Sequence, residues 1–281
     1  MKKINRRSFL AAAGLTAAAL ALTACGGSAS STTSSTASTA SSTASSAAAS
    51  TSAAAELTTV EAGKLTMATN AAFPPYEMTT DSGEFEGIDV DTAKAIAEKL
   101  GLELQIDDMD FDAALLSVQQ GKADIVMAGV TVTDERKAVM DFSDSYATGI
   151  QSIIVPNGSA IASPDDLAGK KIGTQRGTTG YIYCSDDFGD DAVVAYDNGL
   201  TAVQALNNGQ VDAVVIDNAP AMEFVAANPG LKVLDTSYAE EDYAIGLAKG
   251  SALEDAVNAA LEELKADGTL QSIVDKYITA E

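Results

Sequence analysis

Short apolar runs alternate with amphipathic segments along most of the chain, and this alternation restricts the possible folds more than any other feature of the sequence. The runs Leu65–Thr69, Ala123–Ala128 and Val211–Ile216 have the length and composition of buried strands. The segments Asp89–Leu100 and Phe111–Gln120 carry apolar residues at helical spacing, and each is followed by a glycine, which commonly ends a helix. Strands that alternate with helices form parallel sheets covered on both faces, so the sequence predicts an α/β fold.

A second series of the same kind follows in the other half of the chain. It begins with a strand at Lys171–Thr174 and continues through a strand-like pair at 193–194 and a helix at Thr201–Asn208. The amphipathic helix Leu253–Ala266 is the last clear element. Two such series predict two lobes, each a mainly parallel sheet flanked by helices.

Residues 1–56 differ in composition from the rest of the chain. A basic start precedes the apolar stretch Phe9–Ala21, so residues 1–24 are predicted to be a secretory signal peptide, too short to be kept as a membrane span. Leu22-Thr23-Ala24-Cys25 resembles the lipobox of bacterial lipoproteins, which predicts a lipidated Cys25. Asn5–Leu10 also resembles a twin-arginine export signal, so the export route stays open. Residues 25–56 are nearly all serine, threonine and alanine, which predicts a disordered tether and leaves a folded region of 57–281.

Composition excludes several functions. The chain contains no histidine, so nucleophilic catalysis by a serine–histidine or cysteine–histidine pair is excluded. Cys184 is the only other cysteine, and a lipidated Cys25 therefore leaves no intramolecular disulfide. A net charge of −23 with no basic stripe argues against nucleic-acid binding. The acidic run Asp186–Asp191 lacks the spaced ligands of a calcium loop, and we predict neither a metal nor a cofactor.

The residues that are best suited to bind a ligand share one position in the predicted fold, the end of a strand. Asn70, Gly129, Gln175 and Asp217 each follow a predicted strand, and Phe111 lies just beyond another. In open α/β sheets, ligands bind in the crevice outside the carboxyl ends of the strands. Because both lobes present such residues, we expect the site in the cleft between them.

Arg136 is the most informative single residue. We expect Thr133 to cap a helix whose first turn contains Asp134, Glu135 and Arg136, and the helix dipole there favours anions and disfavours a cation. A residue that is electrostatically unfavourable at its own position, next to the end of a strand, is a candidate for a functional site. Its planar guanidinium binds carboxylates through two parallel hydrogen bonds, whereas the alternative is a solvated surface arginine.

Opposite charges at these strand ends indicate the kind of ligand. Arg136 would bind a carboxylate, Asp217 would pair with an ammonium group, and the helix start at Gly177–Thr179 would add N–H groups and hydroxyls for an anion. A carboxylate together with an ammonium group describes an α-amino acid. Phe73 and Phe111 would supply apolar walls. Each residue also has a plainer alternative role, as a helix cap, a loop residue or a packing residue.

The motifs around these residues resemble those of a known family, the polar amino-acid solute-binding proteins of bacterial ABC importers, of the glutamine-binding-protein type. The likeness covers the whole folded region and keeps the family's order and spacing. The segments that carry it are Thr69–Glu77 (TNAAFPPYE), Gly87–Asp91 (GIDVD), Gly129–Arg136 (GVTVTDER), Asp141–Asp144 (DFSD), Asp166–Gly173 (DLAGKKIG), Gly177–Thr179 (GTT) and Val211–Asp217 (VDAVVID).

The resemblance implies a two-lobed clamshell with two hinge strands, one crossing near Tyr146–Ile150 and the other near Ala239–Tyr243. Lobe 1 would then consist of residues 57–146 and 244–281, and lobe 2 of residues 147–243. The implied protein is a binding protein and not an enzyme. A dehydratase-like enzyme on the same scaffold is the alternative, because fold alone does not settle function.

The resemblance also implies a role for each polar group. Arg136 would bind the α-carboxylate, assisted by the Thr131 hydroxyl and by the region around Thr178 and Thr179. Asp217 and the Gly129 carbonyl would take the α-ammonium group.

For the side chain of the ligand, Phe73 and Phe111 would form a sandwich, and Asn70 and Gln175 would touch its end. Both of the latter are neutral amides, which favours a polar, neutral amino acid, although Arg176 lies next to them. The ten predicted ligand-binding residues are Asn70, Phe73, Phe111, Gly129, Thr131, Arg136, Gln175, Thr178, Thr179 and Asp217.

The implied partners are an amino-acid ligand and a membrane permease with its ATPase. The protein would act as a monomer outside the cytoplasm, held at the outer face of the cell membrane by the lipid on Cys25.

Overall fold

The computed structural model describes residues 57–278. The predicted signal peptide at 1–24, the predicted lipidation site Cys25 and the predicted tether at 25–56 lie outside the described residues. Within the part that is described, no helix has the length and apolar character needed to cross a membrane.

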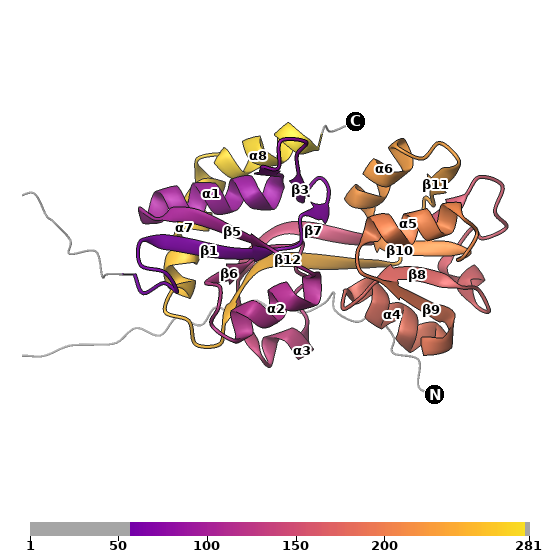
Figure 1. Cartoon of the computed structure of the whole chain (residues 1–281), viewed down its shortest axis with the longest axis horizontal. Coiled ribbons are helices and arrows are strands. Elements are labelled where there is room, and N and C mark those ends of the chain that lie inside the picture. Colours follow the sequence, from indigo (N-terminus) through magenta and orange to yellow (C-terminus); the bar gives the residue numbers. More distant parts are fainter. Residues whose placement is uncertain (1–56, 279–281) are drawn as a thin grey trace, which may run out of the picture. The chain divides into compact units, whose positions relative to one another are not determined.

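The described strands form one nine-stranded sheet and one small three-stranded sheet (Figure 1). The large sheet has the order β5-β1-β6-β12-β7-β10-β8-β9, and β11 pairs with β7. Its strands are β1 (Lys64–Thr69), β5 (Glu103–Asp108), β6 (Ile125–Val126), β7 (Met140–Pro156), β8 (Ile172–Gln175), β9 (Val193–Tyr196), β10 (Ala213–Asp217), β11 (Leu231–Val233) and β12 (Ala239–Ala248). The small sheet consists of β2 (Ala72–Phe73), β3 (Glu77–Thr79) and β4 (Phe85–Glu86).

Two long antiparallel strands, β7 and β12, connect two lobes. On one side of this pair, β1 runs parallel to β5 and β6, and on the other side β8 runs parallel to β9 and β10. Figure 1 shows the helices gathered in two groups around the two ends of β7 and β12. This confirms the predicted α/β fold with two lobes and two hinge strands. The expected crossings at Tyr146–Ile150 and Ala239–Tyr243 fall within β7 and β12, while the exact lobe boundaries stay a prediction.

Helices cover both faces of the sheet in each lobe because the strands are apolar on both faces. In β1, Leu65 and Met67 join the cluster that includes helix α1, whereas Ala68 points to the opposite face and joins the cluster under α2. In β10, Val214 and Val215 divide in the same way. The helices are α1 (Ile88–Leu100), α2 (Phe111–Gln119), α3 (Asp134–Lys137), α4 (Thr179–Phe188), α5 (Gly199–Asn207), α6 (Asn218–Ala226), α7 (Glu254–Ala266) and α8 (Thr269–Tyr277), with short 3₁₀ turns at Pro164–Leu167 and Asp190–Ala192.

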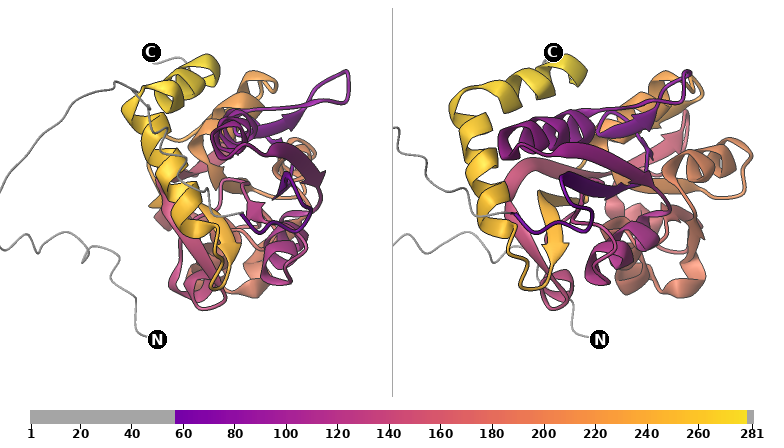
Figure 2. Two further views of the ribbon diagram at one scale, coloured as in Figure 1. Left: turned by 90° about the vertical axis from the view of Figure 1, so that its left-hand side faces the viewer. Right: turned by 60° about the vertical axis from the view of Figure 1, so that its left-hand side comes forward.

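The end of the chain returns to the first lobe. Helices α7 and α8 pack against α1, which lies early in the folded region (Figures 1 and 2). Lys276 of α8 donates to the Asp91 carboxylate of α1 across 2.7 Å, and Tyr277 donates to the same oxygen. These contacts join the C-terminal helices to α1, while the assignment of 244–281 to lobe 1 stays a prediction.

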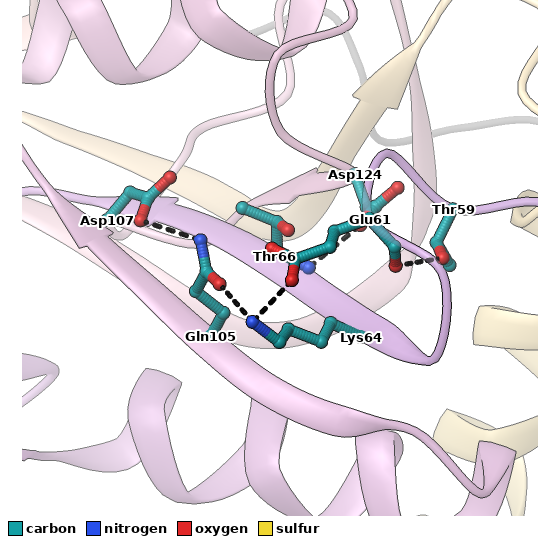
Figure 3. Close-up of polar contacts among 7 residues, drawn as sticks. All are labelled: Thr59, Glu61, Lys64, Thr66, Gln105, Asp107 and Asp124. Carbon is teal, nitrogen blue, oxygen red and sulfur yellow. Dashed lines mark hydrogen bonds and ion pairs between the residues drawn. The ribbon is translucent and has the colours of Figure 1, made fainter.

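Polar contacts anchor the amino end of β1 (Figure 3). The buried Asp124 carboxylate accepts from the backbone N–H groups of Val60 (2.7 Å) and Thr66 (2.8 Å). Lys64 at the start of β1 pairs with Glu61 and donates to the Gln105 side chain of the neighbouring strand. Because this network lies at the amino ends of the strands, the carboxyl ends are left for the residues of the candidate site.

Several elements differ from the sequence predictions, and three of them have a clear physical reason. The strand expected at 123–128 is confined to Ile125–Val126, because only these residues pair with both β1 and β12. Helix α6 was not assigned from the sequence; it contains Pro220, and a proline in the first turn is tolerated because the N–H group that it removes has no partner within the helix. Helix α8 was also missed, since Gly268 directly precedes it and breaks the helical pattern that ends with α7.

Candidate ligand-binding site

All ten predicted site residues line one cavity between the two lobes, together with Glu77 and Ala128. The cavity contains about 320 Å³ of space not occupied by protein atoms, part of which is open to solvent. Its lining comes from the carboxyl ends of β1, β6, β8 and β10, from the starts of α2 and α4, and from β2, β3 and α3. This is the position expected for an α/β sheet, and the roles of the ten residues as ligand contacts stay a prediction.

The Arg136 side chain turns into the cavity. Thr133 caps α3, with its hydroxyl oxygen accepting from the Arg136 backbone N–H at 3.2 Å. The guanidinium then folds back to donate to the Thr131 carbonyl at 2.7 Å and, across the cleft, to the Gly177 carbonyl at 3.2 Å. It also lies 5.4 Å from the centroid of the Phe111 ring. Arg136 is only 9% exposed, so it is not a solvated surface residue.

Asp217 is the last residue of β10, on the other side of the cavity. It occupies the N-cap position of α6, yet its side chain accepts no capping hydrogen bond, so capping does not account for it. The Gln151 side chain donates to its Oδ2 at 2.8 Å. Burial, together with the nearby charge of Glu241, raises the pKa of Asp217 to about 7. The carboxyl is therefore poised to gain from an ammonium partner.

Gly129 and Phe73 form the wall next to Asp89. Gly129 has φ +56°, and a Cβ atom at this position would lie 2.9 Å from the Phe73 ring, so both the backbone and the close approach require glycine. Its N–H group donates to Asp89 Oδ2 at 2.9 Å, and the Tyr146 hydroxyl of β7 donates to the other oxygen at 2.7 Å. Asp89 thus ties the cavity wall to a hinge strand, and burial raises its pKa to about 6.

Glu77 lines the cavity and was not among the predicted site residues. It is fully buried, and burial together with the charge of Asp89 raises its pKa well above the usual range. The carboxyl is therefore held in its neutral form beside the Asp89 carboxylate.

The two predicted side-chain amides meet across the cleft. Gln175, at the end of β8, donates to Asn70 Oδ1 at 2.9 Å, and Asn70 at the end of β1 donates to the Met109 carbonyl at 2.8 Å. Thr178 also lines the cavity, but its hydroxyl donates to the Gln175 carbonyl and caps α4 by accepting from the Tyr181 N–H group. Thr178 therefore has less freedom to serve a ligand than Thr179.

Two further polar residues on the hinge strands were missed. Glu241 of β12 and Gln151 of β7 are buried. The Gln151 side chain donates to the Glu241 carboxylate, which also accepts from the Thr179 hydroxyl. A sequence signal for Glu241 exists, because it lies two residues before the buried Tyr243 and therefore on the same inward face of its strand. Burial of a charged residue on a strand face is costly unless the charge is paired, so such a residue is a candidate for a functional role.

The geometry defines a class of protein. Two lobes joined by two crossing strands, with a buried cavity that carries opposite charges from opposite lobes, are suited to enclose a small zwitterionic molecule. Among residues 57–278, no three histidine, cysteine or acidic side chains are grouped so that they would hold a metal ion.

Comparison with known proteins identifies the family. Residues 65–280 match the model of the bacterial extracellular solute-binding proteins, family 3, and the chain belongs to this family. It is 35% identical to a probable histidine-binding protein of Neisseria gonorrhoeae, over 76% of this chain and 83% of the relative. Its structure resembles that of the arginine-, lysine-, histidine-binding protein ArtJ from Geobacillus stearothermophilus, with a TM-score of 0.74, 35% identity and coverage of 78% of this chain and 96% of ArtJ. An ancestral arginine-binding protein bound to glutamine has the same TM-score of 0.74 with 42% identity, over 78% of this chain and 99% of that protein.

These relatives are binding proteins, which confirms the prediction that this chain is not an enzyme and sets aside the dehydratase-like alternative. The family membership also confirms the resemblance read from the sequence motifs.

Proposed function

We propose that this chain is the extracytoplasmic substrate-binding subunit of an amino-acid ABC importer. It captures a polar L-amino acid between its lobes and delivers it to a membrane permease with its ATPase. It acts as a monomer, held at the outer face of the cell membrane by lipid on Cys25. The observation that carries this proposal is the pair Arg136 and Asp217, which come from opposite lobes, are both buried and line one cavity.

The placement of the two charges explains how capture closes the cleft. A ligand that touched only one lobe would leave the open–closed equilibrium unchanged. An α-amino acid needs Arg136 for its carboxylate and Asp217 for its ammonium group, so it binds the closed form more tightly and shifts the population toward it. Charge-assisted hydrogen bonds contribute about 1.5–3 kcal/mol each, and four of them, less ordering costs, are enough for affinities of about micromolar or tighter.

The side chain of the ligand faces the Asn70 and Gln175 amides, which supports a polar, neutral amino acid such as glutamine. An amide can both donate to and accept from another amide, whereas a charged side chain there would meet no countercharge from these two residues. The related ancestral protein that was found bound to glutamine supports the same assignment.

A basic amino acid is the second candidate, and Glu77 favours it. Its buried carboxyl lines the cavity and, once ionised, would pair with a guanidinium or ammonium group. Since its pKa is raised well above the usual range, it would have to release a proton when such a ligand binds. Relatives that are named for arginine, lysine and histidine point in the same direction.

Calorimetric titration of the purified full-length chain with each of the twenty L-amino acids tests the function. We expect the tightest binding from L-glutamine or another neutral polar amino acid, with D-glutamine as the stereochemical control. If none of the L-amino acids binds, the importer assignment is wrong.

Titration of L-glutamine and L-arginine in two buffers of different ionisation enthalpy separates the two candidates. Both ligands would displace the proton that Asp217 carries near pH 7, but arginine that pairs with Glu77 would release close to one proton more than glutamine, and Glu77→Gln would remove this excess together with most of the arginine affinity. Glutamine binding should leave the Glu77 proton in place. Lipid anchoring is tested separately by membrane fractionation, in which Cys25→Ser should release the protein.

A further inference from the structure

A buried carboxylate lies where the two lobes and the hinge meet. Glu241 is 7% exposed, and its Oε2 atom accepts hydrogen bonds from three side chains. The donors are Thr131 Oγ1 at 3.0 Å, Thr179 Oγ1 at 2.9 Å and Gln151 Nε2 at 3.0 Å. These three come from the first lobe, the second lobe and the hinge strand β7, so one oxygen atom joins all three parts of the molecule.

The two threonine hydroxyls have their hydrogen atoms committed to Glu241. A hydroxyl has one hydrogen to donate and two lone pairs with which to accept. The Oγ1 atoms of Thr131 and Thr179 are 3.4 Å apart, farther than either is from Glu241, so the carboxylate is the better acceptor for both hydrogens. Both threonines line the cavity, and toward a ligand they are therefore left with lone pairs only.

The charges nearby fit a positive group at the same place. Gln151 Nε2 donates to Glu241 and also to Asp217 Oδ2 at 2.8 Å, which brings the two carboxylates to one side of the cavity. An ammonium group has three N–H donors and no acceptor. Asp217 and the two oriented hydroxyls together offer it three acceptors.

We propose that Glu241 is a positioning residue that fixes the Thr131 and Thr179 hydroxyls as acceptors for the α-ammonium group of the captured amino acid. This inference rests on the proposed function and deepens it. It also changes the role expected for the Thr131 hydroxyl, which serves the ammonium group and not the α-carboxylate. Arg136 and the N–H groups at the start of α4 then hold the carboxylate.

The test compares two molecules that differ only in the amino group. L-Glutamine and glutaramic acid, or L-arginine and 5-guanidinopentanoic acid if arginine binds more tightly, are titrated into the full-length chain. Glu241→Met keeps the volume of the side chain but removes the acceptor, so the hydroxyls are free to turn. We expect the affinity ratio between the amino acid and its deamino analogue to fall at least about tenfold, because hydrogen bonds to a charged group are lost only by the former. Glu241→Gln keeps one acceptor oxygen and should retain most of the ratio.

Three results would overturn the proposal. Equal losses for both probes in Glu241→Met would show a structural role alone. Equal behaviour of the Gln and Met variants would show that Glu241 acts through its charge and not by orienting hydroxyls. A comparable fall in the ratio for Glu240→Gln, a neighbouring exposed glutamate on the same strand, would show that the effect is not specific to this position.

Thr179→Val supplies a second, independent test if Glu241→Met does not fold by circular dichroism. Removal of the hydroxyl should lower the ratio, and Thr179→Ser, which keeps it, should restore the ratio. An unchanged ratio in Thr179→Val would refute the proposal. A wild-type chain that binds no L-amino acid would instead refute the proposed function, whereas wild-type binding with an unaffected ratio would refute only this inference.

Discussion

The proposed pairing of Asp217 with an ammonium group makes binding depend on pH in a definite direction. The carboxyl must be ionised to hold the cation, and its pKa in the structure is about 7. Below pH 7 the proton competes with the ligand, and the apparent affinity falls about tenfold for each pH unit. At pH 5 the expected loss is about 100-fold, or about 2.7 kcal/mol, whereas between pH 8 and 9 the affinity should hardly change.

The same group affects stability with the opposite sign. Its pKa is raised from 3.8 in the unfolded chain to about 7 in the folded one, so folding favours the protonated form. Its contribution to the free energy of unfolding is therefore fully present below about pH 4 and is lost as the pH rises to about 7. Asp217→Asn should consequently abolish binding and yet raise the unfolding free energy at pH 8, with little change at pH 4.

Calorimetry between pH 5 and pH 9, with the amino acid that binds most tightly at pH 8, measures the first effect, and urea denaturation measures the second. Glu241→Gln removes a charge that raises the pKa of Asp217, so the midpoint should move to lower pH. Tyr146→Phe alters the surroundings of Asp89 instead and should leave the midpoint in place. An affinity that varies less than twofold from pH 5 to pH 8, in protein that circular dichroism shows to be folded, would refute the pairing.

Three substitutions test other parts of the structure. Arg136→Ala should weaken amino-acid binding by about 100-fold or more, because two charge-assisted hydrogen bonds are lost at about 1.5–3 kcal/mol each. Calorimetry measures the affinity and circular dichroism shows that the variant is folded, and retained affinity would remove the residue from the site. Gly149→Ala should lower the unfolding free energy by about 1–3 kcal/mol in urea denaturation, since the added Cβ would lie 2.5 Å from the nearest atom of a facing tyrosine ring, whereas Gly230→Ala, with no atom within 4 Å, should have no such effect. Tyr146→Phe removes a 2.7 Å hydrogen bond to the ionised form of Asp89, whose pKa is about 6, and should cost about 1–3 kcal/mol at pH 8 and less at pH 5; an equal cost at both pH values would contradict this account.

The fold was predictable where local pattern and tertiary structure agree. Helix α1 ends at Leu100 as expected because Gly101 takes a left-handed conformation, with φ 70°, that few other residues adopt. The hinge strands were not predicted from local pattern, because β7 mixes polar and apolar residues and is held by long-range pairing with β12. Only the family resemblance located the crossings, at Tyr146–Ile150 and Ala239–Tyr243.

The residues of the candidate site divide in the same way, into those that local pattern predicts and those that depend on tertiary structure. Residues at strand ends, such as Asn70 and Asp217, were found because the carboxyl edge of a parallel sheet is a position that sequence can predict. Gln151 was missed because its contacts join the two lobes and the hinge, which local spacing does not reveal, whereas the alternation that places Glu241 on the buried face of β12 was present in the sequence and was not used. Glu77 was within a recognised motif, but its full burial beside Asp89 depends on packing alone.

The amide pair across the cleft sharpens the choice of ligand. In the structure Gln175 donates to Asn70, so a side chain that enters between them must replace this hydrogen bond as well as form its own. A ligand amide can accept from Gln175 and donate to Asn70 at the same time, which leaves neither protein amide without a partner. A guanidinium has donors only, so it can satisfy Asn70 but would leave the Gln175 N–H group to find another acceptor, and it would also need the proton of Glu77 to leave. Under the proposed function, one hydrogen bond between two protein amides is replaced by two hydrogen bonds to the ligand amide. This replacement favours a neutral amide side chain. The double variant Asn70→Ala with Gln175→Ala should weaken L-glutamine binding more than it weakens L-alanine binding, and an equal loss for the two amino acids would contradict this reasoning.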